Sequence, residues 1–204
     1  MKNIWLTWAQ EIQSISQAGL EYSRDPYDIE RFERLREISV EILSEYTNLD
    51  SKIIADLFAN ESGYQTPKID VRAVVNKGDK LLFVRENNGK WSLPGGWADI
   101  NYSARENVKK EVKEEAGINV EPEKIIAVFD RNKHYDDNYP YSVYSIFIKC
   151  KYIDGTFIRN IETTAAEFFP KDEIPGLCKA KITQKQLDAC YAFIEGRSRE
   201  VIFD

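Results

Sequence analysis

The first third of the chain carries apolar residues at three- and four-residue steps, which is the spacing of amphipathic helices. We expect a first helix that ends near Gly19. Its apolar stripe consists of Trp5, Trp8, Ile12 and Ile15. A second helix is expected to begin at Asp25-Pro26, because an N-cap residue followed by proline signals a helix start. Its apolar positions are Ile29, Phe32, Leu35, Ile38 and Ile42.

A shorter apolar run predicts a third helix before the break at Asn60-Glu61-Ser62-Gly63. Its members are Ile53, Ile54, Leu57 and Phe58. The pattern therefore predicts a small all-helical N-terminal domain over residues 1–63.

Strand-like patterns replace the helical spacing after Pro67. Apolar residues at 71–75 and 81–84 flank residues 76–79 as two strands flank a turn. Further elements are expected as follows: a short strand at 91–93, a helix from about Ser103 to Ala116, strands near 123–130 and 141–152, and a terminal helix from Thr183. Thr183 and Gln186 have the spacing of a capping box. We expect an α+β domain over residues 64–204.

The composition is typical of a soluble globular protein, with 43% hydrophobic and 30% charged residues in a chain of 204. The first residues lack the apolar stretch of a signal peptide or membrane span, so we expect a cytoplasmic protein without membrane contact. The three cysteines form no CxxC pair and are expected to be buried thiols. They are Cys150, Cys178 and Cys190.

The formal net charge of −6 disfavours general binding of nucleic acid, because it repels phosphate backbones. The same acidity suits a chain that recruits a divalent cation. Many ordinary proteins are equally acidic, so the charge alone decides nothing.

The informative chemistry lies in an acidic helix that follows the loop Gly95-Gly96-Trp97. Glu114 and Glu115 follow Glu111 by three and four residues, so all three side chains project from the same face of the helix. Such a cluster is tolerable when a hard cation sits among the oxygens, and Mg²⁺ favours a few carboxylates with water and phosphate. The alternative is a solvated helix face in which these glutamates pair with neighbouring lysines.

The loop and the helix together resemble the Nudix box, Gly-x5-Glu-x7-Arg-Glu-aliphatic-x-Glu-Glu-x-Gly-aliphatic. Aligned from Gly96, the chain matches every fixed position but two. Tyr102 stands where the pattern has its first glutamate, and Lys110 stands where it has arginine. Lysine keeps the positive charge but lacks the planar fork of arginine. The missing glutamate removes a potential ligand, which implies fewer cations or weaker binding of them.

The resemblance implies the Nudix fold, an α/β/α sandwich with a mixed sheet, here behind a helical N-terminal domain. It implies metal-assisted attack of water on a pyrophosphate, with Mg²⁺ as cofactor and Mn²⁺ as a substitute. Carried over by residue, it makes Glu111, Glu114 and Glu115 metal ligands, with the carbonyl of Gly95 as a further donor. Glu111 and Glu114 are also candidate catalytic residues, and Gly117 suits the left-handed end of the helix.

Other segments resemble the Nudix subgroup that acts on X-linked nucleoside diphosphates. These segments are 5–13, 18–20, 25–28, 130–134 and 167–170. The resemblance points to a small nucleotide substrate, first CDP-choline, cut to CMP and phosphocholine, with ADP-ribose as the alternative. It also implies a homodimer through the N-terminal helices. Internal packing of Trp5 and Trp8 is the competing interpretation.

Several residues after the motif are candidates for contact with a substrate. Arg131 and Lys133 would bind phosphate, and Trp97 and Tyr135 are further candidates. His134 is the sole histidine and would act as a general base, unless it is a surface residue without a catalytic role.

Three further interpretations stay open. A cage for choline would draw on Tyr135, Tyr139, Tyr141 and Tyr144, although ordinary strand patterning explains the same residues. Glu162 or Glu167 could supply a base or ligand from a later loop, or Glu167 could cap a turn. An RNA-directed hydrolase and a non-catalytic nucleotide sensor are the competing functions; net acidity disfavours the first and the intact glutamates disfavour the second.

Overall fold

The computed structural model describes residues 3–47, 50–59, 62–137 and 139–204. The chain divides into two compact units, one of residues 1–68 with 136–142, and one of residues 69–135 with 143–204. The domain boundary expected between residues 63 and 64 stays a prediction. Nothing in the sequence pattern indicates that residues 136–142 join the helical unit.

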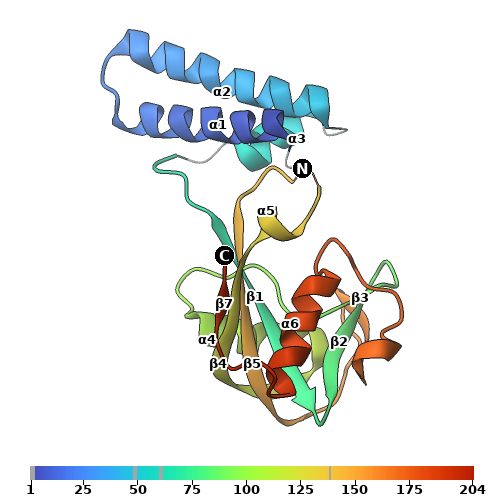
Figure 1. Ribbon diagram of the computed structural model, residues 1–204. Helices are drawn as coiled ribbons and strands as arrows, with labels where there is room; N and C mark the ends of the chain where they lie inside the picture. The colour runs from blue at the N-terminus through green and yellow to red at the C-terminus, as the bar shows by residue number, and fades with distance from the viewer. Residues whose placement is uncertain (1–2, 48–49, 60–61, 138) are drawn as a thin grey trace. The chain divides into compact units, whose positions relative to one another are not determined.

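The helical unit contains α1 (Ile4–Tyr22), α2 (Pro26–Tyr46) and α3 (Ser51–Phe58) (Figure 1). The carboxylate of Asp25 caps α2 by accepting hydrogen bonds from the first backbone N–H groups of the helix, as predicted. Helix α1 continues past Gly19, where the sequence predicted its end. A β-carbon at this glycine would lie 2.4 Å from the ring of Phe32, so Gly19 serves the close approach of α1 and α2.

The second unit is built on a seven-stranded mixed sheet in the order β3-β2-β1-β5-β4-β7, with β6 paired to β2. Its strands are β1 (Lys68–Lys77), β2 (Lys80–Glu86), β3 (Trp91–Ser92), β4 (Ile118–Asp130), β5 (Val143–Gly155), β6 (Thr163–Phe169) and β7 (Ile202–Phe203). Most pairs are antiparallel, whereas β4 and β7 are parallel. The hairpin of β1 and β2 turns where the sequence predicted, with Lys77 opposite Lys80.

Alternate residues of the strands build one apolar core on each face of the sheet. Helix α4 (Ala104–Ala116) packs on one face through Val108, Val112 and Ala116. Helix α6 (Gln184–Ile194) packs on the other face, where Leu187, Cys190 and Tyr191 join its core; Figure 1 shows α6 in front of the sheet. This arrangement confirms the predicted α/β/α sandwich with a mixed sheet.

Both long helices of this unit begin with a capping box, of which the sequence analysis predicted the one at Thr183. Ser103 begins α4 with a capping box, and Thr183 forms one with Gln186 at the start of α6. All three cysteines are buried free thiols, as predicted. Among the described residues, no helix is both long enough and apolar enough to cross a bilayer.

The sequence pattern missed several short elements: β6, β7, helix α5 (Arg131–His134) and a 3-10 turn at Lys171–Glu173. It also placed the start of β4 too late, because polar residues, Asn119 and Glu121, occupy the exposed positions of its first residues. Glu167, a candidate turn cap, lies instead within β6 opposite Phe83.

Replacement of Gly117, which ends α4, should cost more stability than replacement of Gly196. Its φ is +70°, and an added β-carbon would lie 2.4 Å from the carbonyl oxygen of Thr156. Gly196 has φ +74° and open space around it, so Gly196→Ala isolates the cost of the left-handed backbone. Urea unfolding should show a loss of about 1 kcal/mol for Gly196→Ala and about 2 kcal/mol more for Gly117→Ala. Equal losses would contradict the close packing at Gly117.

Candidate functional site

The loop that carries the two glycines is fixed along strand β1. The backbone N–H of Val71 donates to the carbonyl of Gly96 at 2.9 Å, and that of Ala73 donates to the carbonyl of Pro94 at 2.8 Å. Gly95 has φ +143°, and a β-carbon there would lie 2.0 Å from the carbonyl oxygen of Val71. Only glycine therefore fits at position 95.

Two carboxylates of α4 reach this loop. Glu115 is 4% exposed, and its Oε2 accepts a hydrogen bond from the backbone N–H of Gly95 at 2.8 Å. The carboxylate of Glu111 lies against Gly96, where an added β-carbon would come within 2.6 Å of its Oε2. Both glycines thus make room, one for the β1 backbone and one for Glu111.

The protein environment disfavours the charged form of both carboxylates. Burial raises the pKa of Glu115 to about 7, against the opposing effects of the Gly95 N–H and of the charges of Lys181 and Arg72. Burial also raises the pKa of Glu111, and the nearby charges of Glu114 and Glu162 act in the same direction. Bound positive charge would favour the ionised form of both groups.

A buried ion pair on β1 supports the loop from behind. The guanidinium of Arg72 donates to Oδ2 of Asp70 at 2.7 Å and to the carbonyl oxygen of Gly95 at 2.6 Å. Both side chains are almost fully buried. Arg72 therefore fixes the Gly95 carbonyl, whose second lone pair stays available.

Lys110 gathers the acidic groups on the outer side of α4. Its Nζ lies 2.8 Å from a carboxylate oxygen of Glu114, 3.2 Å from one of Asp99 and 3.7 Å from one of Glu111. The side chain of Glu114 is about half exposed in this pair. Tyr102, at the position of the missing glutamate, is exposed.

Two family models match the chain. A NUDIX domain matches residues 66–189, and a UDP-X-like, N-terminal oligomerisation domain matches residues 3–58. The chain belongs to the Nudix family.

Two of the similar proteins extend over almost the whole chain. YjhB of Bacillus subtilis (strain 168), provisionally named an ADP-ribose pyrophosphatase, is 44% identical over 98% of this chain and 97% of its own length. A crystal structure of a UDP-X diphosphatase covers 98% of both chains at 33% identity and a TM-score of 0.65. A crystal structure of an ADP-ribose pyrophosphatase from Streptococcus suis 89-1591 shares 43% identity over 68% of this chain and 100% of its own, with a TM-score of 0.63.

The donors at the Gly95–Gly96 loop fit the divalent cation that Nudix hydrolases use. Glu111, Glu115 and the Gly95 carbonyl offer hard oxygen ligands, and Mg²⁺ commonly completes such a set with water and substrate phosphate. Among the described residues, no three His, Cys, Asp or Glu side chains are grouped to hold an ion by themselves. The metal-binding roles of Glu111, Glu114, Glu115 and Gly95 remain predictions, and Glu114 is engaged by Lys110.

The other predicted site residues lie on or after α5 and in the loop. Arg131 is buried, with its guanidinium 4.4 Å from the ring centre of Tyr135, whereas Lys133 is exposed. The Tyr135 hydroxyl donates to Gln186 at 3.1 Å. Trp97 is half exposed. Their substrate contacts remain predictions.

His134 is enclosed rather than open to a substrate. Its side chain is 2% exposed, and Nε2 lies 2.8 Å from Oδ2 of Asp204. The ring also packs 4.5 Å from that of Phe129. These contacts tie α5 to the segment after β7, so a catalytic role for His134 stays a prediction that the geometry does not favour.

The four tyrosines of the suggested choline cage fall into different units. Tyr139 and Tyr141 pack edge to face in the helical unit, whereas Tyr135 and Tyr144 belong to the other unit. The ring of Tyr135 already faces Arg131. Neither unit by itself therefore presents the complete set of rings.

Sequence reasoning missed the Asp70–Arg72 pair and named Glu162 without deciding for it. A signal for the pair existed, because two charged residues interrupt an apolar strand from Ile69 to Val75. Glu162 is exposed in the segment before β6 and its charge acts on Glu111. Of the two later glutamates, the structure brings Glu162 toward this Nudix site.

Gly96→Ala should separate the activity of the Nudix site from its stability. The new methyl group would displace only the flexible tip of Glu111, so the free energy of unfolding should change by less than about 1 kcal/mol. Pyrophosphatase activity should fall about 10- to 100-fold.

Gly95→Ala is the matched variant, because its methyl group would strike the β1 backbone. It should lose about 2 kcal/mol or more in urea unfolding. Full activity of Gly96→Ala would show that the position of Glu111 against the loop is irrelevant to the reaction.

Proposed function

We propose that this Nudix pyrophosphatase is a magnesium-dependent hydrolase of nucleoside diphosphates linked to a second group, with Mn²⁺ as a substitute. One observation carries the proposal: the carboxylates of Glu111 and Glu115 converge on the Gly95–Gly96 loop. Net acidity supports a small nucleotide over RNA as the substrate.

The chain's own residues supply the positions that this reaction requires. Glu111 and Glu115 would hold the cation, and Arg72 orients the Gly95 carbonyl beside them. When bound, the cation supplies charge neutralisation for the pyrophosphate and a water with a lowered pKa. Glu162 and Glu114 are exposed carboxylates whose charges act on Glu111, and Lys110 engages Glu114. Glu162 is therefore a better candidate for the base than the enclosed His134.

ADP-ribose is our first choice among the linked nucleoside diphosphates. Two relatives named for ADP-ribose share 44% and 43% identity with the chain. The distribution of the tyrosines gives no specific support to the choline cage, so CDP-choline becomes the second choice. The free thiols agree with the cytoplasmic location expected from the sequence.

A substrate panel with a Glu115→Gln variant tests this function. With Mg²⁺, the wild-type chain should convert ADP-ribose to AMP and ribose 5-phosphate, and removal of the cation by EDTA should abolish the reaction. Glu115→Gln should lose at least about 100-fold in kcat/KM, since it removes a charged ligand. Chromatography of the products distinguishes this result from CMP and phosphocholine released from CDP-choline.

Glu121→Gln is the control, because Glu121 pairs with Lys109 and Arg105 of α4 and lies on exposed β4 surface. Its activity should stay within a few-fold of the wild type. Release of nucleotides from short RNA alone would identify the RNA-directed function. Nucleotide binding without turnover of any substrate would identify a sensor.

We further propose that the chain forms a homodimer through α1. Its exposed side carries Ile4, Trp8, Ile15 and Tyr22, which lie on one stripe of the helix. Residues 3–58 match a family described as an oligomerisation domain. A second copy is the occupant that this description favours for an apolar stripe of this length.

Trp8→Glu should disrupt that dimer, because it places a charge in the centre of the apolar stripe. Light scattering on the full chain should show the mass of a dimer for the wild type and of a monomer for the variant. Tyr64→Glu, at a still more exposed aromatic outside the helices, should leave the dimer intact. A dimeric Trp8→Glu protein would exclude this stripe as the interface.

A further inference from the structure

The charges of two side chains, Arg72 and Lys181, favour the ionised form of the buried Glu115 carboxylate. The two differ in burial and in the number of their bonds to other groups. Arg72 is almost fully buried and is bound to both Asp70 and the Gly95 carbonyl. Lys181 exerts the larger charge effect on Glu115, although it comes from the segment before α6. Its side chain is 35% exposed. Lys181 is therefore the cation that solvent, or a ligand, can reach.

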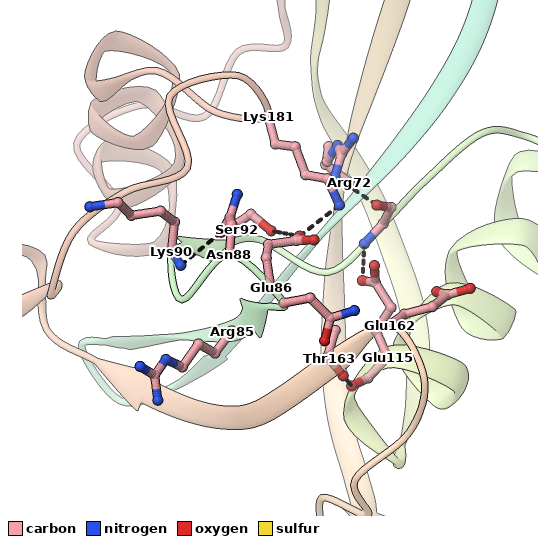
Figure 2. Close-up of polar contacts among 12 residues, drawn as sticks. Arg72, Arg85, Glu86, Asn88, Lys90, Ser92, Glu115, Glu162, Thr163 and Lys181 are labelled. Carbon is pink, nitrogen blue, oxygen red and sulfur yellow. Dashed lines mark hydrogen bonds and ion pairs between the residues drawn. The ribbon is translucent and has the colours of Figure 1, made fainter.

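Lys181 is held beside the site by a carboxylate at the end of β2. Its Nζ lies 2.6 Å from Oε1 of Glu86, and the hydroxyl of Ser92 donates to the same oxygen at 2.7 Å. Glu86 is 14% exposed. Figure 2 shows Lys181 and Arg72 on the side of the cluster that faces Glu115, whereas Arg85 and Lys90 point away from it.

We propose that Lys181 binds a phosphate oxygen of the substrate's pyrophosphate and that Glu86 is its positioning residue. This inference rests on the proposed function, because it assumes a pyrophosphate beside the carboxylates of Glu111 and Glu115. A lysine ammonium has three donors, and Glu86 accepts from one of them. The remaining donors can meet a phosphate oxygen while the contact with Glu86 persists.

The charge balance of the site favours an anion at this position. Two carboxylates, Glu86 and Glu115, lie near one lysine, so the local net charge is negative. A divalent cation bound by Glu111 and Glu115 would make it positive. Lys181 would then face the additional negative charge of the substrate rather than that of Glu115 alone. The ion pair of Lys181 with Glu86 is partly buried, and anchoring of the chain before α6 does not explain why the lysine side chain stays 35% exposed.

Steady-state kinetics with ADP-ribose test the proposal on the full chain. Lys181→Met should raise KM about 10- to 100-fold, which is the effect of losing one charged hydrogen bond, and should change kcat by less. Lys181→Arg should recover most of the affinity, since it keeps the charge. Glu86→Ala should also raise KM although Glu86 does not touch the substrate, and Glu86→Gln should raise it less because its amide oxygen still accepts.

Lys171→Met is the matched control. Lys171 is also 35% exposed and pairs with Asp188 at 2.9 Å. Its KM should equal that of the wild type. Equal increases in both lysine variants, or an unchanged KM in Lys181→Met, would overturn the proposal. If Lys181→Met fails to fold, Lys181→Gln provides the same comparison with a polar side chain.

A binding experiment separates this proposal from the proposed function. Calorimetric titration with ADP, with Ca²⁺ in place of Mg²⁺, should show about 10-fold or weaker binding to Lys181→Met than to the wild type. Failure of the wild type to hydrolyse any linked nucleoside diphosphate would reject the proposed function. Turnover by the wild type with equal ADP affinity in both proteins would reject only the role of Lys181.

Discussion

The site depends on the close approach of α4 to the Gly95–Gly96 loop, where the glycines have no side chains to prevent the contact. Glu115 reaches the backbone N–H of Gly95, and the carboxylate of Glu111 occupies the space beside Gly96. The loop can lie this close because Gly95 adopts φ +143° against the backbone of β1. Helix packing, strand register and glycine conformation therefore all contribute to the position of two carboxylates.

Burial of those carboxylates carries an electrostatic cost that the fold only partly offsets. The pKa of Glu115 is raised to about 7 although a backbone N–H and two cations favour its charged form. A folded protein rarely keeps such groups without partners, and here the remaining partner would come from outside the chain. The unfavourable charge arrangement is thus the physical argument for a cation and an anionic substrate at the same place. Arg72 contributes fixed support, whereas Lys181 remains within reach of a ligand.

The sequence predicted the elements that have strong local signals. Periodicity located the long helices and the β1–β2 hairpin, and the predicted caps at Asp25 and Thr183 have clear local chemistry. The spacing of glycines and glutamates pointed to Gly95, Gly96, Glu111 and Glu115, because these residues lie within one loop and one helix. The contact of Lys181 with Glu86 spans 95 residues and has no local signal. Strand β6 was missed for a related reason, since its pairing with β2 defines it more than its own pattern does.

The two departures from the Nudix box show how tertiary contacts change the meaning of a motif. Lys110 lacks the fork of arginine, yet it lies within 4 Å of carboxylates from Asp99, Glu111 and Glu114. The pattern's first glutamate is absent, and exposed Tyr102 does not replace it. Asp99, three positions earlier, instead brings a carboxylate from the loop to Lys110. Its backbone is fixed there by Asn107, which accepts from the Asp99 N–H at 2.8 Å and donates to its carbonyl at 3.3 Å. The acidic surroundings of Lys110 therefore include a carboxylate from outside the fixed positions of the motif, which a comparison position by position does not detect.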